Sequence, residues 1–334
     1  MIAQLIPLTK ATGMGPLPDL VEDMAGTKAL ARVFSKTQLP LAIVENREQE
    51  ILMPQMVHLF ENASREVGER LFGLRVGLEM QPGAYGKWTR YAAEADTLEK
   101  AILRLRRTIS LHQNAGQIML GVRGKMAVMA YSHPTMLSER GKNHADHILP
   151  VMIRVIQKFM GPFWKPEWVR MFYEDDGCKD QISDAIGADV RFNGKGVSIA
   201  LKRDDLKTRN PSTPEIKLTA QDVTAEVISA KNRGDLAYIE ALVSLRLLDG
   251  DSDITGVAQL ADTSVRSLQR KLHEEGLSYR KILDRVRFER AKSLLLETST
   301  AVTEISLLTG FSDPAHFTRS FKRWSGVPPS HFRA

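Results

Sequence analysis

The chain has 334 residues, of which 43% are hydrophobic and 26% charged, and its formal net charge is +6. This composition excludes an intrinsically disordered chain, and the length is sufficient for two domains. Cys178 is the only cysteine, which excludes a disulfide framework and predicts a reducing, cytoplasmic location.

The first part of the chain mixes helical and strand patterns, which predicts an α+β domain over residues 1–212. Asp96–Leu105 begins with a plausible capping residue and repeats its apolar residues at helical spacing. Two strands are joined across Arg123-Gly124-Lys125 as a hairpin. The predicted helices are Leu17–Phe34, Pro54–Leu71, Thr97–Gln113 and Asn143–Met160, and the predicted strands are Gln117–Val122, Met126–Tyr131, Trp168–Tyr173 and Gly196–Lys202.

The stretch Leu206–Lys217 holds two prolines among mostly polar residues, which predicts a loop or linker. We place the linker region at 213–234, and the segment Thr219–Gly234 fits either neighbouring domain. The remaining residues, 235–334, contain no convincing strand and predict an all-α domain. The helices predicted after Lys217 are Thr219–Ala230, Leu236–Leu248, Ile254–Ala261, Val265–Glu275, Tyr279–Leu296, Val302–Leu308 and Pro314–Trp324.

Two segments of the helical domain repeat one pattern of a short helix, a tight turn and a longer helix. In the short helices Ile254, Val257 and Leu260 match Val302, Ile305 and Leu308 at an offset of 48. In the longer helices Leu268, Arg270 and Leu272 match Phe317, Arg319 and Phe321 at an offset of 49, so the extra residue falls in the turn. A capping residue starts each longer helix: Ser264 in the first copy, and Ser312 or Asp313, followed by Pro314, in the second.

This is the helix-turn-helix pattern, present twice, at 254–275 and 302–324. The second helix of each copy would turn its polar face outward, where Arg can bind guanine and Gln can bind adenine through two hydrogen bonds. Early residues of such a helix contact base edges, and later basic residues contact phosphates. The predicted DNA-binding residues are Arg266, Ser267, Gln269 and Arg270 in the first copy and His316, Thr318, Arg319, Lys322 and Arg323 in the second.

The segment between the two copies, Ser278–Glu297, is predicted to form one long amphipathic helix whose core positions are Ile282, Val286, Leu294 and Leu295. A helix of about 18 residues spans ~27 Å, and successive major grooves on one face of a duplex lie ~34 Å apart. The helix can therefore set two recognition helices in successive grooves. From Ser264 to Ala334 there are 13 Lys and Arg against 7 Asp and Glu, so this segment carries the whole positive excess.

Residues 254–333 resemble the tandem helix-turn-helix domain of AraC/XylS-type transcription regulators. The second copy, AVTEISLLTGFSDPAHFTRSFKRWSGVPPSHFR, is close to the signature of that family throughout. The first copy is similar to a subgroup that carries an N-terminal domain of the arabinose-binding type, and Leu39–Pro54 and Phe72–Leu78 resemble parts of that domain. Ser306 stands where the family has its usual small residue, and serine is small enough to keep the helices packed.

The resemblance implies a regulator of transcription in which an α+β sensor and dimerisation domain precedes the DNA-binding domain. Its partners would be promoter DNA, RNA polymerase, a small-molecule effector and a second copy of the chain. Effector binding would change the geometry of the dimer or the orientation of the DNA-binding helices. The resemblance assigns no effector and no pocket residues, and no cofactor is expected.

Other candidate sites fit structural roles better than chemical ones. His144 and His147, three residues apart with His133 upstream, could share a helix face and bind a metal, but no third and fourth ligand with suitable geometry is evident. Cys178 has no partner cysteine and no obvious base for a catalytic thiol. Six aromatic residues either line a ligand pocket or belong to the core: Trp88, Tyr91, Tyr131, Trp164, Trp168 and Phe172.

Three carboxylates, Glu94, Asp96 and Glu99, fit capping and the helix dipole better than acid–base chemistry. No phosphate-binding loop, nucleophile elbow or zinc-protease motif occurs. No segment approaches the ~18 uninterrupted apolar residues of a membrane span, and no basic region of a secretion signal precedes the first apolar run. Neither a membrane span nor a secretion signal is expected.

Two other functions are compatible with this organisation. In one, the α+β domain is an enzyme with a helical appendage, and the missing catalytic constellation argues against it. In the other, the chain compacts DNA without sequence preference, and two faces that carry Arg and Gln argue for sequence recognition instead. The sequence therefore favours a regulator that is not an enzyme.

Overall fold

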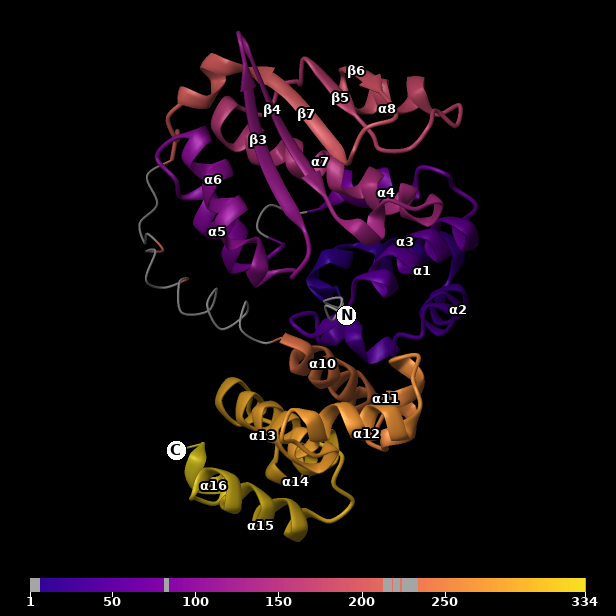
Figure 1. The fold of residues 1–334 in the computed structure, drawn as a ribbon, viewed down its shortest axis with the longest axis vertical. Helices are drawn as coiled ribbons and strands as arrows, with labels where there is room; N and C mark the ends of the chain where they lie inside the picture. The colour runs from indigo at the N-terminus through magenta and orange to yellow at the C-terminus, as the bar shows by residue number, and fades with distance from the viewer. Residues whose placement is uncertain (1–6, 81–83, 213–217, 219–222, 224–233, 334) are drawn as a thin grey trace. The chain divides into compact units, whose positions relative to one another are not determined.

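The computed structural model describes residues 7–80, 84–212, 218, 223 and 234–333 (Figure 1). The chain divides into two compact units, Met1–Gly234 and Asp235–Ala334, which we call the N-terminal and the C-terminal unit. The predicted linker region 213–234 and the predicted helix Thr219–Ala230 lie almost entirely outside the described residues.

A five-stranded sheet in the order β3-β4-β7-β5-β6 forms one layer of the N-terminal unit (Figure 1). β5 and β6 are parallel, and the other neighbouring strands are antiparallel. The hairpin predicted across Arg123-Gly124-Lys125 pairs Gln117 with Ser132 and Arg123 with Met126. The strands are β3 Gln117–Arg123, β4 Met126–Ser132, β5 Trp168–Arg170, β6 Asp189–Arg191 and β7 Val197–Lys202.

Two helices, α6 (Leu98–Thr108) and α7 (Lys142–Met160), bury the inward face of this sheet. The strand register places apolar residues in rows across that face, as the pairings Met129–Ile199 and Val169–Ile199 show. Alternate residues of β4 are buried, which is the pattern of a strand with one covered face. The core of the unit therefore lies between the sheet and these helices.

The N-terminal end adds a second layer of helices beside α7. Its first helices are separated at Gly26, because that residue adopts a φ of 85° and both caps α1 and starts α2. A two-stranded antiparallel pair, β1 with β2, lies beside α3. The elements of this layer are β1 Leu8–Lys10, α1 Leu17–Ala25, α2 Thr27–Thr37, β2 Glu50–Leu52, α3 Met53–Val67 and α4 Phe72–Glu79. Elsewhere in the unit α5 (Lys87–Ala93) packs against α6, and α8 (Lys179–Ile186) packs against β6.

Two glycines four residues apart allow α4 to contact α7 at backbone distance. A Cβ added at Gly73 would lie 1.9 Å from the carbonyl oxygen of Asn143, and one at Gly77 would lie 2.3 Å from that of His147. Residues at i and i+4 share a helix face, so these glycines form a flat strip on α4. Only glycine fits at these two positions of the segment Phe72–Leu78.

The C-terminal unit is all helical in its described residues (Figure 1). The predicted core positions Ile282, Val286 and Leu295 are buried, and Leu294 packs partly buried against the core. An ion pair between Arg285 and Glu240 joins α13 to α10. The helices are α10 Gly234–Leu248, α11 Ile254–Leu260, α12 Val265–Glu274, α13 Tyr279–Glu297, α14 Val302–Leu308, α15 Pro314–Ser325 and α16 Pro329–Phe332.

Several predicted boundaries in the N-terminal unit were wrong. The helix predicted over Leu17–Phe34 is two helices, and the one predicted over Thr97–Gln113 ends at Thr108 and continues as a 3₁₀ turn over Ile109–Leu111. The strand predicted over Trp168–Tyr173 stops at Arg170. In the part of the chain that the structure describes, no helix combines the length and apolar character needed to cross a membrane.

Candidate nucleic-acid interface and ligand cavity

The first helix-turn-helix unit consists of α11, a four-residue turn and α12. Ser264 starts α12, because its side chain accepts a hydrogen bond from the backbone N–H of Ser267 at 3.1 Å. Asp253 caps α11 in the same way, accepting from the N–H of Gly256 at 2.9 Å, and this contact lowers the pKa of Asp253 to about 2. Two capped helices with a short turn fix the direction in which α12 projects.

The second unit, α14 and α15, repeats this geometry with a turn one residue longer. Asp313, rather than Ser312, is the cap, because its carboxylate accepts from the N–H groups of Ala315 and His316 at 2.9 and 3.0 Å. Gly310 lies in the turn with a φ of 74°, a conformation that favours glycine. The two short helices start 48 residues apart and the two longer ones 49, as the repeat in the sequence predicted.

Buried side chains hold the inner face of each longer helix. Leu268 and Leu272 of α12 are 3% and 1% exposed, and Phe317 and Phe321 of α15 are fully buried. The second unit has its own core, in which Phe311 of the turn packs on Phe317. Because one face of each helix is fixed in a core, the opposite face is presented to solvent.

The outward face of α12 carries three exposed polar side chains, Arg266, Gln269 and Arg270. Arg270 is 3.9 Å from Glu274 in a solvent-exposed pair that contributes little to stability. Ser267 is half-buried, and its hydroxyl lies 2.9 Å from that of Ser264. Two guanidinium groups and an amide are therefore available on one helix face for a partner.

The outward face of α15 carries His316, Arg319, Lys322 and Arg323, all of which are exposed. The guanidinium of Arg319 lies 3.7 Å from the carboxylate of Asp313, the residue that caps the same helix. The imidazole of His316 packs edge-on against Phe311 at 5.3 Å between ring centroids.

Two residues of the predicted set on α15, Thr318 and Arg323, are already bonded inside the C-terminal unit. Thr318 donates its hydroxyl to the carbonyl of Pro314 at 2.9 Å. Arg323 forms an ion pair with Asp284 of α13 at 3.2 Å. Arg323 is therefore partly engaged in holding α15 against α13, whereas Arg319 and Lys322 point away from the core.

Arg287 of α13 connects the two helix-turn-helix units. Its Nη2 donates to the hydroxyl of Ser252, in the loop before α11, at 3.1 Å and to the carbonyl of Gly310, in the second turn, at 2.8 Å. Its guanidinium also lies 4.5 Å from the centroid of the Phe311 ring. One side chain thus holds the start of the first unit and the turn of the second unit on the same helix.

The histidines considered for a metal site are buried in the N-terminal unit, at and near a cavity. Among the described residues, no group of three or more His, Cys, Asp or Glu side chains is arranged to hold a metal. Asp146, between His144 and His147, instead accepts hydrogen bonds from Arg70, at 2.6 Å, and from the hydroxyl of Tyr173. Burial raises the pKa of Asp146 to about 6.

The other candidate chemical residues have structural surroundings. Cys178 is buried as a free thiol, and burial raises its pKa above the usual value. Asp96 pairs with Lys100 at 2.7 Å, and Glu99 lies in the first turn of α6, whose cap is Thr97. Glu94 accepts a hydrogen bond from the N–H of Leu218 at 2.5 Å.

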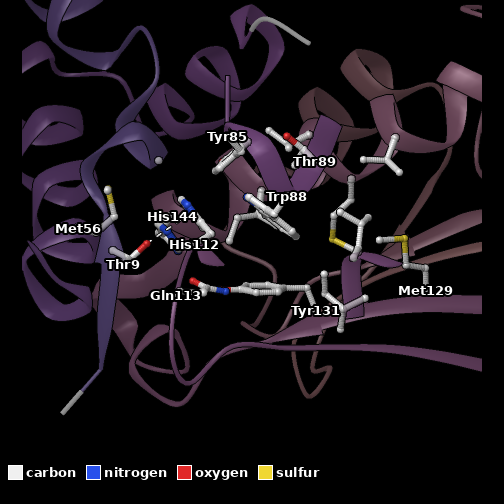
Figure 2. Close-up of a pocket in the computed structure, with 17 residues that line it drawn as sticks. Thr9, Met56, Tyr85, Trp88, Thr89, His112, Gln113, Met129, Tyr131 and His144 are labelled. Carbon is white, nitrogen blue, oxygen red and sulfur yellow. Dashed lines mark hydrogen bonds between the residues drawn. The ribbon is translucent and has the colours of Figure 1, made fainter. Parts of the chain in front are cut away.

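A cavity of about 70 Å³ lies in the N-terminal unit where α5 and α7 meet strands β3 and β4 (Figure 2). We call it the inner cavity. Most of its lining is apolar, and several of the polar exceptions lie together at one end. Figure 2 shows that end, where Thr9, His112 and His144 lie close together beside the mutually hydrogen-bonded pair Gln113 and Tyr131.

Burial keeps the histidines around this cavity uncharged. It lowers the pKa of His112 and His147 to about 3 and that of His133 to about 4, and it holds the pKa of His144 well below its usual value. The Nδ1 atoms of His112 and His144 are buried, and no described residue forms a hydrogen bond with them. The inner cavity therefore offers neutral hydrogen-bonding groups in an apolar wall.

Two of the six aromatic residues considered for a pocket, Trp88 and Tyr131, line the inner cavity. Tyr91 instead lies under the guanidinium of Arg104 at 4.3 Å, and Trp168 lies beneath those of Arg170 and Arg191. Trp164 and Phe172 pack against the hydrophobic core. His112 and Tyr85 were not singled out from the sequence, because nothing in their local pattern differs from that of core residues.

Comparison with known proteins gives matches to both units. A family model for the arabinose-binding N-terminal domain of AraC transcription regulators matches residues 29–210, and a helix-turn-helix domain model matches residues 257–334. The chain is similar to the ornithine utilization regulator of Pseudomonas aeruginosa, with 24% identity over 99% of this chain and 97% of that protein.

Two further relatives are regulators by name. The transcriptional regulator VirS of Mycobacterium tuberculosis is 24% identical over 99% of this chain and 98% of its own length. The regulator VqsM of Pseudomonas aeruginosa is 32% identical over 128 residues, a match that spans 38% of this chain and 39% of that protein.

Proposed function

The chain belongs to the AraC family of transcription regulators, and from this premise we propose how its two units act. It is a DNA-binding regulator with a helix-turn-helix domain, and its relatives are regulators rather than enzymes. We propose that it recognises a specific operator by inserting α12 and α15 into two successive major grooves.

The observation that supports this proposal most strongly is the duplication itself. Two helix-turn-helix units each bury one face of a longer helix and expose basic and amide side chains on the other. Arg266, Gln269 and Arg270 are suited to base edges in the first half-site. In the second half-site His316 and Arg319 lie early enough on α15 to contact bases.

The remaining residues of the proposed interface would position the protein without selecting a sequence. Lys322 lies late on α15, where a basic side chain meets phosphates. Ser267 and Thr318 are half-buried at the edge of the interface. Arg323 would contact phosphate only by giving up part of its ion pair with Asp284, so we assign it the smaller contribution.

Recovery of bound fragments from sheared genomic DNA of the host organism tests sequence recognition. The full-length protein is expected to enrich a few sites that share a two-part motif about one helical turn apart. Uniform recovery that is lost at moderate salt would mean that the protein only attracts phosphates. That result would exclude the proposed sequence recognition in the absence of a ligand.

We further propose that a small-molecule effector binds the inner cavity and controls DNA binding. The cavity supports this because its lining combines an apolar wall with a few uncharged polar side chains, among them His112 and Gln113. Native mass spectrometry of protein purified from host cells is expected to detect a bound compound that is lost on denaturation. Protein of unmodified mass under native conditions would argue against an effector that is retained during purification.

Two partners follow from the family and remain proposals for this chain. We propose that the chain forms a homodimer through its N-terminal unit and contacts RNA polymerase at the promoter. Sedimentation equilibrium of the full-length protein is expected to give twice the mass of one chain. Transcription in vitro from an enriched site, with purified polymerase, is expected to change when the protein is added.

A further inference from the structure

A second and larger cavity adjoins the inner one. It has a volume of about 470 Å³ and lies between α5 and the C-terminal half of α7, and we call it the outer cavity. Four residues line both cavities: Tyr85, Thr89, Val151 and Val155. A single ligand that displaces these side chains slightly can therefore occupy both spaces.

The outer cavity carries three positive charges, from Arg90 of α5 and from Arg154 and Lys158 of α7. Arg154 donates to the backbone carbonyl of Leu78, and Lys158 donates to the hydroxyl of Ser212 at 3.1 Å. The carbonyl of Leu78 and the hydroxyl of Ser212 carry no charge. In the part of the chain that the structure describes, no carboxylate forms an ion pair with any of the three cations. The three charges are therefore available to an anion.

Neither cavity offers a carboxylate to a cation. Among the described residues that line the two cavities there is no Asp or Glu. An ammonium group placed in the outer cavity would meet three like charges, and one placed in the inner cavity would lose its hydration without gaining a counter-ion. This arrangement disfavours amines and amino acids with more than one ammonium group.

The inner cavity suits the uncharged part of a ligand. Its wall is largely apolar, and His112 and His144, which are 7% and 5% exposed, are held neutral by burial. These neutral side chains, with the amide of Gln113 in the same lining, give no net charge to stabilise an anion. The two cavities together therefore distinguish a charged end from an uncharged end.

We propose that the effector is an organic monocarboxylate with an aliphatic or aromatic body. Its carboxylate binds Arg90, Arg154 and Lys158 in the outer cavity, and its body enters the inner cavity towards Trp88 and His112. This inference rests on the proposed function, since it names the chemical class of the effector for the site proposed there.

Binding of compounds that differ only in the head group tests this assignment. The full-length protein is titrated by calorimetry with octanoate, 1-octanol and octylamine, and with 3-phenylpropionate, 3-phenyl-1-propanol and 3-phenylpropylamine. In at least one series the carboxylate is expected to bind about tenfold more tightly than the alcohol, because hydrogen bonds to charged groups are the stronger ones. The amine is expected to bind most weakly.

A charge-neutral variant locates the carboxylate. Arg90→Gln combined with Lys158→Gln is expected to weaken carboxylate binding about tenfold or more and to leave alcohol binding unchanged. Arg107→Gln is the matched control, because Arg107 is exposed in the same unit and lines neither cavity. Unchanged carboxylate affinity in the double variant would overturn the proposal.

The remaining outcomes separate this proposal from the proposed function. Alcohols or amines that bind as tightly as the carboxylates would overturn the chemical class and leave the cavity as an effector site. If none of the six compounds binds, both the class and the effector site are overturned. The recovery of operator fragments from genomic DNA, measured on the same preparation without added compound, tests sequence recognition separately from the class of the effector.

Discussion

Arg270 and Arg319 occupy equivalent positions on the exposed faces of α12 and α15. Arg270→Ala and Arg319→Ala are each expected to cost roughly 1–3 kcal/mol of binding to the operator and to relax base preference in one half-site, because a two-fold hydrogen bond to a base is lost. Fluorescence anisotropy with operator and scrambled duplexes measures both effects. Arg107→Ala removes the same charge from the N-terminal unit and should change neither. Equal losses of affinity for the operator and the scrambled duplex would mean that the arginines act only on phosphates, and two variants that bind like Arg107→Ala would mean that neither arginine contacts DNA.

Ser306 is fully buried in α14, and its hydroxyl has no hydrogen-bond partner among the described residues. Ser306→Ala is therefore expected to leave the free energy of unfolding unchanged or to raise it by up to about 1 kcal/mol. Thr309→Val is the contrast, because the Thr309 hydroxyl donates to the carbonyl of Ile305 at 2.7 Å and its loss should destabilise the unit. Urea unfolding measures both, and a marked destabilisation by Ser306→Ala would reveal a partner for the hydroxyl.

At the scale of single residues, the sequence predicted those side-chain roles that depend on residues nearby in the chain. The exposed arginines and the capping serine followed from helix spacing, because each depends on neighbours within one or two turns. The proximity of His112 and His144 did not follow, because those residues are far apart in the sequence and meet only through packing of α7 beside the sheet (Figure 2). Tertiary contacts of this kind leave no periodic pattern in a single sequence.

The start of α15 depends on one carboxylate. Asp313→Ala removes the acceptor for two backbone N–H groups and is expected to lower the free energy of unfolding of the C-terminal unit by about 0.5–2 kcal/mol. Ser312→Ala, one residue earlier, should have almost no effect, because Ser312 is exposed and is not the cap. Thermal unfolding followed by circular dichroism compares the two, and equal losses would mean that both side chains cap the helix.

The packing of α4 on α7 depends on two glycines. Gly73→Ala and Gly77→Ala would place a Cβ within 2.3 Å of a backbone oxygen of α7, so the helices must move apart at a cost of about 2 kcal/mol or more. Gly121→Ala is the control, because an added Cβ at that position of β3 meets nothing within 4 Å. Chemical unfolding of the three variants measures the difference; a Gly77→Ala protein as stable as Gly121→Ala would mean that α4 is not held at backbone distance.

At the scale of elements, the helices α10 to α15 of the C-terminal unit were predicted within a few residues because capping residues and glycines mark their ends, whereas the four-residue helix α16 was not predicted. The short strands β1, β2 and β6 were missed, since three residues carry too little alternation to identify a strand without its partner. The break between α1 and α2 was also missed, although Gly26 marks it. An isolated glycine is tolerated inside a helical pattern, so its effect is decided by packing.

Over the whole molecule, the neutral histidines predict sensitivity to acid. The four buried histidines around the inner cavity have a folded-state pKa below the unfolded value, and burial lowers the pKa of the half-buried His58 as well. Their contribution to the free energy of unfolding is therefore fully present above pH ~6.5 and is lost as the pH falls, because the unfolded chain then binds protons. Each contributes about 1 kcal/mol between pH 7.5 and 5.5. Asp146 has the opposite effect on stability. Its raised pKa makes the folded protein bind a proton in the same pH range, and this one carboxyl offsets part of the destabilisation caused by the four imidazoles.

Urea unfolding at pH 7.5 and 5.5, followed by tryptophan fluorescence, measures this dependence. The free energy of unfolding is expected to be lower by a few kcal/mol at pH 5.5. His133→Asn should reduce the difference, because Asn keeps an acceptor for the N–H of Thr135 but does not titrate. His273→Asn, at an exposed position, should not reduce it. Equal stability at the two pH values would mean that the histidines are protonated in the folded protein.

The division into an α+β and an all-α domain was predictable because helix and strand patterns are local, and the duplicated helix-turn-helix was predictable because it repeats such a pattern. The type of the N-terminal domain followed from the resemblance to the family. The cavities were not predictable, because their walls combine β1, α5, α7 and the sheet. Only Trp88 and Tyr131 of the six aromatic residues considered line the inner cavity. Aromatic residues are equally suited to core and cavity, and only the fold decides between them.

The contacts of Arg287 give the operator a property beyond its base sequence. Because this one side chain holds both the loop before α11 and the turn before α15, the two half-sites must lie at a fixed rotational phase. A single base pair inserted between them turns one half-site by roughly 35° about the duplex axis, as 10–10.5 base pairs make one turn. The length of the spacer therefore contributes to specificity. The protein would bind poorly to a site in which both half-sites have the correct sequence but lie at the wrong rotational phase.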